Sequence, residues 1–265
     1  MTWLQVCRAA VADVEAVLER LPTRAEREPV VGQGSGGDET TAIDKAAEEA
    51  ILARVQDGAG AVVSEEIGRV AGGVGGGRAL LVVDPIDGSL NAKRGIPFFA
   101  LSIAVAEGET MDDVHFGFVH DFGSGEEWTA YRGGGAWRNG EPLGAERPKD
   151  DVEILSFEAT RTSLVARDAP KVAELAYRLR IMGSLALSLC HLAAGRVDAV
   201  CSLKPARSVD IAAAQLLCRE LGLVIDLFDV EESFGAAPLD LEQRSRVVAA
   251  GTRDVCTRIA HALST

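Results

Sequence analysis

Two aspartates three positions apart, Asp84 and Asp87, belong to the most chemically specific segment of the sequence, residues 84–89 (DPIDGS). Pro85 has no backbone N–H and stiffens the turn, so the two carboxylates can face one point. The carbonyl of Ile86 offers a third oxygen between them. Two carboxylates and a carbonyl oxygen suit a hard divalent cation. The segment therefore predicts a metal site.

The end of this segment suits a different ligand. Gly88 has no side chain, so the backbone can approach a bound group closely. If a helix begins at Ser89, its first amides would bind a phosphate oxygen. A single Asp-x-x-Asp turn is usually a helix cap, but this segment directly follows an apolar strand expected at residues 79–83. That context favours a site for metal and phosphate.

Three further acidic residues, Asp44, Glu65 and Asp210, stand where an apolar strand ends or a helix begins. Strand ends point their side chains into one crevice, so we expect these residues to join Asp84 and Asp87 there. The formal net charge of −13 and the pI near 4.8 repel phosphorylated substrates. A carboxylate cluster that collects divalent cations would neutralise a phosphate locally.

These segments resemble the motifs of the inositol monophosphatase and fructose-1,6-bisphosphatase family. Residues 84–89 are similar to its DPIDGT metal-binding motif, residues 64–68 (SEEIG) to its upstream acidic element, and residues 209–213 (VDIAA) to its late WDxAA element. Weaker matches keep the family's order from about residue 38 to residue 226. The SEEIG form and residues 95–98 (GIPF) resemble the archaeal branch, whose members often hydrolyse both inositol phosphates and fructose 1,6-bisphosphate.

The resemblance implies a Mg²⁺-dependent phosphatase with two or three ions per site. Glu65, Asp84 and the Ile86 carbonyl would hold one Mg²⁺, and Asp84, Asp87 and Asp210 a second. Two such ions, about 3.5–4 Å apart, neutralise the phosphate, lower the pKa of a bound water and stabilise the leaving alkoxide. No nucleophilic side chain is required.

The same resemblance implies roles for the phosphate-binding and catalytic residues. Asp87, Gly88 and Ser89 would contact the phosphate. Asp44 with Ser89 would orient or deprotonate the attacking water, and Glu65 completes the catalytic set. The expected substrate is a small phosphorylated polyol or sugar.

Departures from the family pattern bear on substrate choice. Val209 stands where tryptophan is common, and Leu203 stands where many inositol phosphatases have an acidic residue. The loss of that acceptor disfavours inositol hydroxyls, and nearby cations could hold a second phosphate. For any one cation, a solvated surface position is an equally good interpretation. The expected substrate-binding set beyond the phosphate motif is Arg180, Ser184, Lys204 and Arg207.

Other acidic residues have weaker patterns. Asp38 and Glu39 could serve a third metal site or merely solubilise the glycine-rich loop expected at residues 29–37, itself either a surface loop or an active-site lid. If residues 64–66 are extended, Glu66 faces away from Glu65 and is structural. His191 lies in an apolar helix, where packing is the better interpretation.

Two other functions stay open. A related branch of phosphatases acts on 3′-phosphoadenosine 5′-phosphate, although the sequence shows no insert to hold an adenine. A protein of a different class would bind metal and phosphate without catalysis. Phosphate release by an Asp87→Asn variant separates these two classes.

Hydrophobic periodicity predicts a mixed α/β chain. We expect helices at residues 4–21 and 45–55, the second ended by residues 57–58, then strands at 61–64 and 79–83 with a glycine-rich loop at 68–77 between them. Strands at 98–106, 114–119 and 127–131, separated by turn residues, predict an antiparallel meander. A polar, proline-containing segment near residue 150 divides an N-terminal lobe (1–150) from a C-terminal lobe (151–265).

The second lobe alternates elements. We expect strands at 152–157, 179–182, 199–203 and 224–228, and helices at 169–177, 185–194 and 211–221. The family resemblance implies a layered αβαβα sandwich for the whole chain.

Composition limits location and partners. The sequence has no apolar run near the roughly 20 residues of a membrane span, and polar residues interrupt the N-terminus too early for a signal peptide. Its negative charge disfavours nucleic acids and anionic membranes. The five cysteines lack metal or redox spacing and are expected to be small buried thiols. We expect a cytoplasmic protein, and by family analogy a homodimer.

Overall fold

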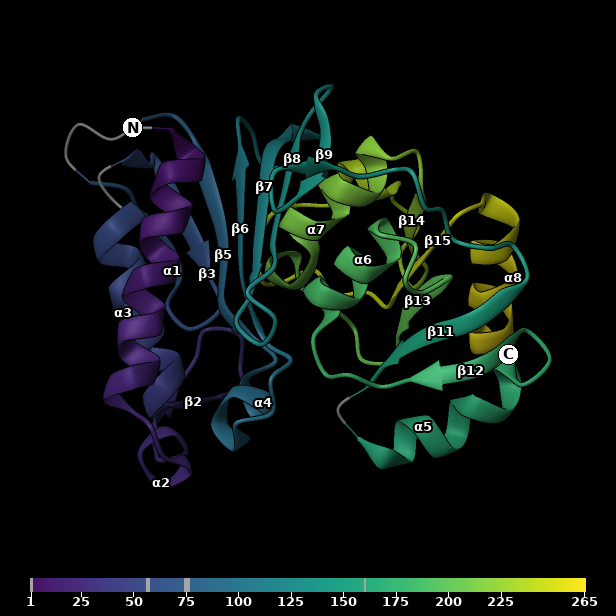
Figure 1. Cartoon of the computed structure of the whole chain (residues 1–265), viewed down its shortest axis with the longest axis horizontal. Helices are drawn as coiled ribbons and strands as arrows, with labels where there is room; N and C mark the ends of the chain where they lie inside the picture. The colour runs from purple at the N-terminus through teal and green to yellow at the C-terminus, as the bar shows by residue number, and fades with distance from the viewer. Residues whose placement is uncertain (1, 56–57, 74–76, 160) are drawn as a thin grey trace.

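The computed structural model describes residues 2–55, 58–73, 77–159 and 161–265. The first half of the chain contributes a large sheet of eight strands (Figure 1). Every neighbouring pair in it is antiparallel except β3 and β5, so the predicted meander is confirmed. In spatial order its strands are β10 (Glu141–Pro142), β9 (Gly135–Arg138), β8 (Glu127–Tyr131), β7 (Val114–Asp121), β6 (Ala100–Ala106), β5 (Leu80–Asp87), β3 (Ala61–Ser64) and β4 (Gly68–Ala71).

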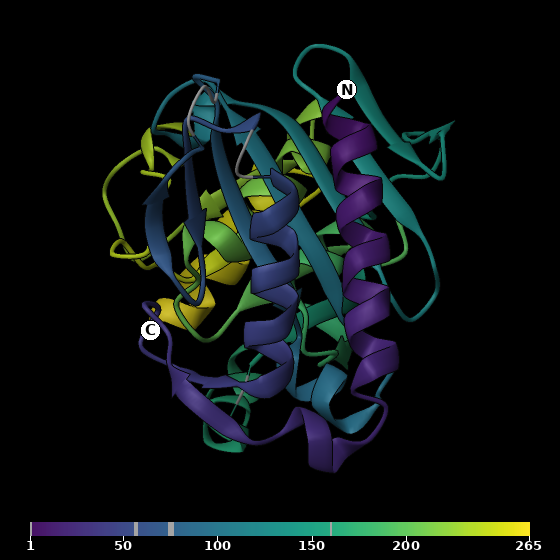
Figure 2. The same ribbon diagram turned by 90° about the vertical axis from the view of Figure 1, so that its left-hand side faces the viewer.

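The alternation of side chains along β5 explains why helices cover both faces of this sheet. Leu81 and Val83 pack with the apolar residues of α1 (Trp3–Arg20) and α3 (Ala42–Val55), which lie side by side on one face (Figure 2). Leu80 and Val82 point to the opposite face and pack with α6 (Leu185–Ala193) and α7 (Ser208–Glu220). A strand buried on both faces reads as the continuous apolar run seen in the sequence.

A second sheet lies on the other side of α6 and α7. Its order is β12 (Ala176–Arg180), β11 (Val152–Glu158), β13 (Ala199–Ser202), β15 (Val247–Ala250) and β14 (Val224–Leu227). Helices α5 (Thr162–Asp168) and α8 (Arg253–Ser264) cover its outer face through a separate apolar core. The layers therefore run helix, sheet, helix, sheet, helix, which confirms the expected fold class (Figure 1).

Short elements complete the fold near the carboxyl ends of β3 and β5. The hairpin of β1 (Val30–Gln33) and β2 (Glu39–Thr41) precedes α3, and α4 (Ser89–Arg94) follows β5. The helix α2 (Arg24–Arg27) joins α1 to the hairpin. Elsewhere in the described chain, 3₁₀ turns lie at Met111–Asp113, Ala169–Val172 and Phe234–Ala236.

Several predicted elements were wrong. Residues 68–71, expected in a loop, form β4 and pair with β3, and much of the loop expected at 29–37 is strand β1. The helix predicted at 169–177 is instead a 3₁₀ turn followed by the start of β12, because Pro170 limits the turn and the chain is extended from Ala176. The C-terminal pair β15 and α8 was not predicted. Residues 57 and 74–76, within the predicted helix end and loop, lie outside the described residues.

The five cysteines are buried and free, as predicted. His191 stacks on Phe98 and packs against the edge of Trp128, which confirms the packing interpretation. Along the described stretches of chain, no helix combines the length and apolar character that crossing a bilayer requires.

Candidate active site

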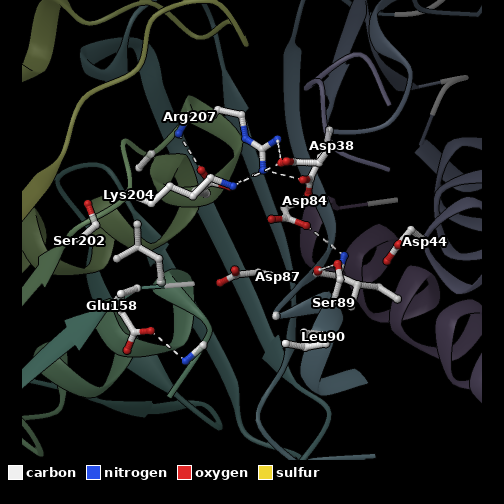
Figure 3. A pocket seen from close by; sticks show the side chains of 18 of the residues that line it. Asp38, Asp44, Asp84, Asp87, Ser89, Leu90, Glu158, Ser202, Lys204 and Arg207 are labelled. Atoms are coloured by element: carbon white, nitrogen blue, oxygen red, sulfur yellow. Dashed lines mark hydrogen bonds and ion pairs between the residues drawn. The ribbon is translucent and has the colours of Figure 1, made fainter. Parts of the chain in front are cut away.

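A cavity of about 280 Å³ lies where the ends of β3 and β5, the start of α4 and the start of α7 meet (Figure 3). Its wall is strongly acidic. The cations lining it are Lys93, Lys204 and Arg207, against the carboxylates of Asp38, Glu39, Asp44, Glu65, Glu66, Asp84, Asp87, Glu158 and Asp210. The structure thus brings together every predicted metal ligand, including Ile86, with the predicted catalytic residues Asp44 and Ser89.

The end of β5 orders the central residues of this cavity. Asp84 is 2% exposed, and its Oδ1 accepts a hydrogen bond from the amide of Ile86 at 3.0 Å. The Ser89 hydroxyl donates to the Ile86 carbonyl at 2.9 Å. Gly88 precedes α4 with a φ of 92°, a left-handed conformation that disfavours any side chain. The helix predicted from Ser89 is present.

Asp87 is held from the second half of the chain. Its Oδ2 accepts hydrogen bonds from the Ser184 hydroxyl at 2.6 Å and from the Ala186 amide at 2.7 Å. Ser184 also caps α6, is 1% exposed and does not line the cavity. Its hydroxyl is therefore placed to orient Asp87 rather than to touch a substrate. Burial raises the pKa of Asp87 to about 7, against the hydrogen bond from Ser184.

Asp44 offers a carboxylate oxygen without a partner. Its Oδ2 accepts from the amide and hydroxyl of Thr41 at 3.1 and 2.5 Å, and lies 3.9 Å from Lys93. Its Oδ1 is buried and has no hydrogen-bond partner among the described residues. A buried oxygen in that state favours an additional ligand, either a cation or a water, because leaving it unsatisfied is unfavourable.

Glu66 was expected to face away from Glu65 if residues 64–66 were extended, and that condition is not met. Strand β3 ends at Ser64, so residues 65–67 form a turn that brings both Glu65 and Glu66 to the cavity. Glu66 accepts a hydrogen bond from the hydroxyl of Thr40. Burial raises the pKa of Glu66 to about 7.

The side chain of Arg207 pairs with the carboxylates of Glu65, Asp210 and Asp38. It is 6% exposed, and one terminal nitrogen donates to Glu65 Oε1 at 2.5 Å and to Asp210 Oδ1 at 3.3 Å. The other terminal nitrogen lies 3.5 Å from Asp38 (Figure 3). The backbone amide of Arg207 also donates to Asp210 Oδ2 at 2.6 Å. The guanidinium thus lies between carboxylates, not facing open space as a phosphate-binding residue would.

Of the two remaining predicted substrate-binding residues, one lines the cavity and the other does not. Lys204 lines the cavity, with its ammonium 3.3 Å from Asp38. Arg180 does not line the cavity, is exposed, and donates to the neighbouring carbonyl of Leu179. Its expected place in the site was wrong.

Glu158 is a cavity residue that the sequence interpretation missed. It ends β11, is 6% exposed, and accepts hydrogen bonds from the hydroxyl of Ser188 and the amide of Gly183. Its signal was present in the sequence, because an acidic residue follows the apolar strand at residues 152–157 just as Asp84 follows residues 79–83.

The cluster carries more negative charge than the protein compensates. Burial and the charges of Glu65 and Asp87 raise the pKa of Asp84 well above its ordinary value. Burial likewise raises the pKa of Glu65, although Arg207 lowers it. As they stand, no three acidic, histidine or cysteine side chains of the described residues form a group that could hold a metal ion. Because Arg207 bridges Glu65 and Asp210, a cation would enter by shifting these contacts.

The donor set nevertheless fits a hard cation. It consists of carboxylate oxygens and the Ile86 carbonyl, with one orphaned oxygen on Asp44. Such oxygen-only sets are what Mg²⁺ prefers in proteins, and adjacent buried carboxylates gain most from a divalent charge.

Comparison with known proteins identifies the family. A model of the inositol monophosphatase family matches residues 3–265. The chain belongs to the inositol monophosphatase family. The resemblance noted in the sequence is thereby confirmed, and members of the family are metal-dependent phosphatases.

Two archaeal members illustrate how much of the chain the family covers. A fructose-1,6-bisphosphatase/inositol-1-monophosphatase of Methanocaldococcus jannaschii is 30% identical over 226 residues, 85% of this chain and 86% of that protein. A protein of the same name from Archaeoglobus fulgidus is 30% identical over 253 residues, 94% of each chain. Both names are those of phosphatases, so the expected class of phosphoric monoester hydrolase is confirmed.

A solved structure of a family member has the same fold. The inositol monophosphatase-fructose 1,6 bisphosphatase structure superimposes with a TM-score of 0.82 at 27% identity, covering 99% of this chain and 100% of the other. The layers are therefore those of an inositol monophosphatase-type fold.

Proposed function

We propose that this protein is a Mg²⁺-dependent phosphomonoesterase that acts on small sugar or polyol phosphates, namely fructose 1,6-bisphosphate and/or inositol 1-phosphate. The observation that carries the proposal is the convergence of Glu65, Asp84, Asp87 and Asp210 on one cavity at the start of α4. The names of the archaeal relatives support the choice of substrates.

The chain's own residues supply most of the proposed chemistry. Glu65, Asp84, the Ile86 carbonyl, Asp87 and Asp210 would hold the Mg²⁺ ions, two or three per site. Bound there, Mg²⁺ neutralises the phosphate and lowers the pKa of a water molecule.

The remaining cavity residues would handle the substrate and the water. The Gly88 backbone, the amides at the start of α4 and the Ser89 hydroxyl receive the phosphate, aided by Asp87 as metal ligand. Asp44 accepts a proton from the attacking water through its free Oδ1, with Glu65 and Ser89 completing the catalytic set. The carboxylate wall keeps an unneutralised phosphate out, so binding of metal and substrate is coupled.

Phosphate release tests the proposal. The wild-type protein with Mg²⁺ should release phosphate from fructose 1,6-bisphosphate or inositol 1-phosphate faster than from 3′-phosphoadenosine 5′-phosphate. Asp87→Asn should reduce release at least about 100-fold while circular dichroism and melting show a folded chain. Wild-type rates in that variant would contradict the assignment of Asp87. A wild-type protein that binds Mg²⁺ and releases no phosphate would favour a non-catalytic binding protein.

The organisation, location and partners of the protein also belong to this proposal. One catalytic unit is divided near residue 150 into an N-terminal lobe (1–150) and a C-terminal lobe (151–265), with an apolar core that crosses the division. The protein is a cytoplasmic homodimer, without a nucleic-acid or membrane partner. Size-exclusion chromatography with light scattering checks the oligomeric state.

A further inference from the structure

A second hollow, of about 810 Å³, lies beside the active-site cavity and shares Asp38, Lys204 and Pro205 with it. Its lining includes five cations, Arg161, Arg167, Lys171, Lys204 and Arg246, and one acidic side chain, Asp38. The remaining lining residues are the apolar Leu164, Leu203, Pro205 and Leu263 and the polar Ser264 and Thr265. We call this hollow the basic groove. The basic groove therefore contrasts with the net charge of −13 of the whole chain.

The cations of the basic groove are only partly neutralised. Asp168, which is fully buried, pairs with both Arg167 at 2.5 Å and Lys171 at 3.1 Å, so one carboxylate serves two cations. Arg161 has no ion pair among the described residues. These three residues therefore leave about two uncompensated positive charges, on side chains that solvent can reach.

The other two cations of the basic groove, Arg246 and Lys204, are more fully neutralised by acidic partners. Arg246 forms a multidentate pair with Asp229, at 2.7 Å for the shortest contact, and is closer to neutral. Lys204 shares Asp38 with Arg207, and Asp38 is itself well exposed. Lys204 lines both hollows. In the active-site cavity its ammonium group lies beside Asp38 (Figure 3).

The basic groove offers cations for the second phosphate of a bisphosphate substrate, which the active-site cavity largely lacks. The sequence suggests Lys204, Arg207 and Arg180 as ligands for that phosphate, but Arg207 is buried among carboxylates and Arg180 does not line the cavity. Only Lys204 of the three remains available. A second phosphate therefore needs cations other than Arg207 and Arg180, and the basic groove, which shares Lys204 with the cavity, supplies them.

We propose that the basic groove binds a phosphate monoester group, with Arg161 and Lys171 as its main ligands and Lys204 at its border with the active site. Guanidinium and ammonium groups suit a phosphate dianion, and the apolar side chains Leu164, Leu203 and Leu263 offer contacts for the carbon skeleton that bears it. The phosphate group has two possible sources. If it is the second phosphate of a bisphosphorylated sugar, the inference rests on the proposed function. If it is free inorganic phosphate, the groove is a separate anion-binding site beside the active site.

The test uses a double variant, Arg161→Gln with Lys171→Gln, in the full-length protein. Arg167 stays to pair with the buried Asp168, which protects the fold. The control, Arg54→Gln with Lys149→Gln, removes two equally charged, exposed side chains that do not line either hollow. Melting temperatures of both variants check that each is folded.

Two measurements distinguish the two sources of phosphate. The first is the KM for fructose 1,6-bisphosphate and for inositol 1-phosphate with Mg²⁺. The second is calorimetric binding of inorganic phosphate to the protein in EDTA, where the uncompensated carboxylates of the active site repel phosphate and the groove is left as its site.

The double variant should raise the KM for fructose 1,6-bisphosphate at least about tenfold more than that for inositol 1-phosphate, and the control should not. Loss of inorganic phosphate binding with an unchanged KM ratio would assign the groove to a free anion instead of the substrate. An unchanged KM ratio and unchanged phosphate binding would overturn the proposal. If the wild-type protein releases no phosphate from either substrate, the proposed function fails, while the calorimetry still tests the groove.

Discussion

Arg207 is the residue whose expected role the structure changes most. The sequence suggests a ligand for a second phosphate, whereas the folded chain buries its guanidinium between Glu65, Asp210 and Asp38. In that position it is the internal cation of a cluster that otherwise repels itself. Breaking a buried ion pair costs roughly 3–5 kcal/mol because a charge remains uncompensated.

Replacement of Arg207 by glutamine should therefore destabilise the metal-free protein more than the Mg²⁺-loaded one. Melting curves in EDTA and in Mg²⁺ measure this directly, and the stabilisation by Mg²⁺ should be larger for Arg207→Gln than for the wild type. The effect on hydrolysis should be shared by mono- and bisphosphate substrates. An increase in KM confined to fructose 1,6-bisphosphate, with unchanged response to Mg²⁺, would restore Arg207 as a phosphate ligand.

The individual ligands differ in how far sequence could predict them. Asp84, Asp87, Glu65 and Asp210 were predictable because each follows an apolar strand or begins a helix, and because the motifs resemble a known family. The direction of Arg207 was not, because its partners Glu65 and Asp38 are far from it in sequence. Side-chain orientation depends on such tertiary contacts, which spacing alone does not reveal.

The junction of β5 and α4 is the element on which the site depends most. Gly88 has a φ of 92°, and a Cβ there would lie 3.1 Å from the carbonyl oxygens of Gly183 and Phe98. Alanine would therefore meet both backbone strain and close contacts, on the segment that carries Asp87 and Ser89.

Gly88→Ala should lower the free energy of unfolding by about 1–2 kcal/mol and reduce hydrolysis at least about tenfold. Urea unfolding and phosphate release measure the two effects. Gly125→Ala is the matched control, because Gly125 has a φ of 74° but open space around it, and it does not line the cavity. Equal loss of activity in both variants would mean that backbone strain, and not the position of Gly88, is responsible.

Helices and strands with a strong hydrophobic periodicity or a motif were predictable. Segments whose local composition favours one structure while strand pairing favours another were not. The strand predicted at 127–131 coincides with β8, and the helix predicted at 185–194 ends one residue beyond α6. The segment from residue 169 to 177 has helical composition, but Pro170 and pairing with β11 make its end a strand. Pairing between distant segments competes with local propensity, and here it prevails.

The whole molecule couples stability to pH through the buried carboxylates. The pKa values of Asp87 and Glu66 are raised to about 7 by burial, whereas in the unfolded chain such groups titrate near 4 to 4.5. Between those values the folded state binds more protons than the unfolded state. These groups therefore stabilise the metal-free protein at low pH, and that contribution is lost as pH rises towards about 7.

The stabilisation by Mg²⁺ should consequently grow between pH 5 and pH 8, because ionised carboxylates bind the metal and protonated ones do not. Melting temperatures in EDTA and in Mg²⁺ across this range give the difference directly. Burial lowers the pKa values of His115, His120 and His191, so these residues make the folded state more stable as pH rises. Their effect is the same in EDTA and in Mg²⁺ and cancels in the difference. Asp87→Asn should weaken the pH dependence of the difference, and a difference independent of pH would contradict this assignment.

The arrangement of the layers was predictable, but the basic groove was not. The layered sandwich follows from motifs that resemble a known family and from apolar strands that need cover on two faces. The groove brings together Arg161 near α5, Lys204 after β13 and the end of α8, which are separated by 40 or more positions. Only the folded chain shows that these segments meet beside the active site.

Removal and return of the metal tests the proposed chemistry most directly. Wild-type protein should release phosphate from fructose 1,6-bisphosphate or inositol 1-phosphate in Mg²⁺, lose that activity in EDTA, and recover it when excess Mg²⁺ is added. Undiminished phosphate release in EDTA, or no release from either substrate at any Mg²⁺ concentration, would contradict a metal-dependent phosphatase built on Asp84, Asp87, Glu65 and Asp210.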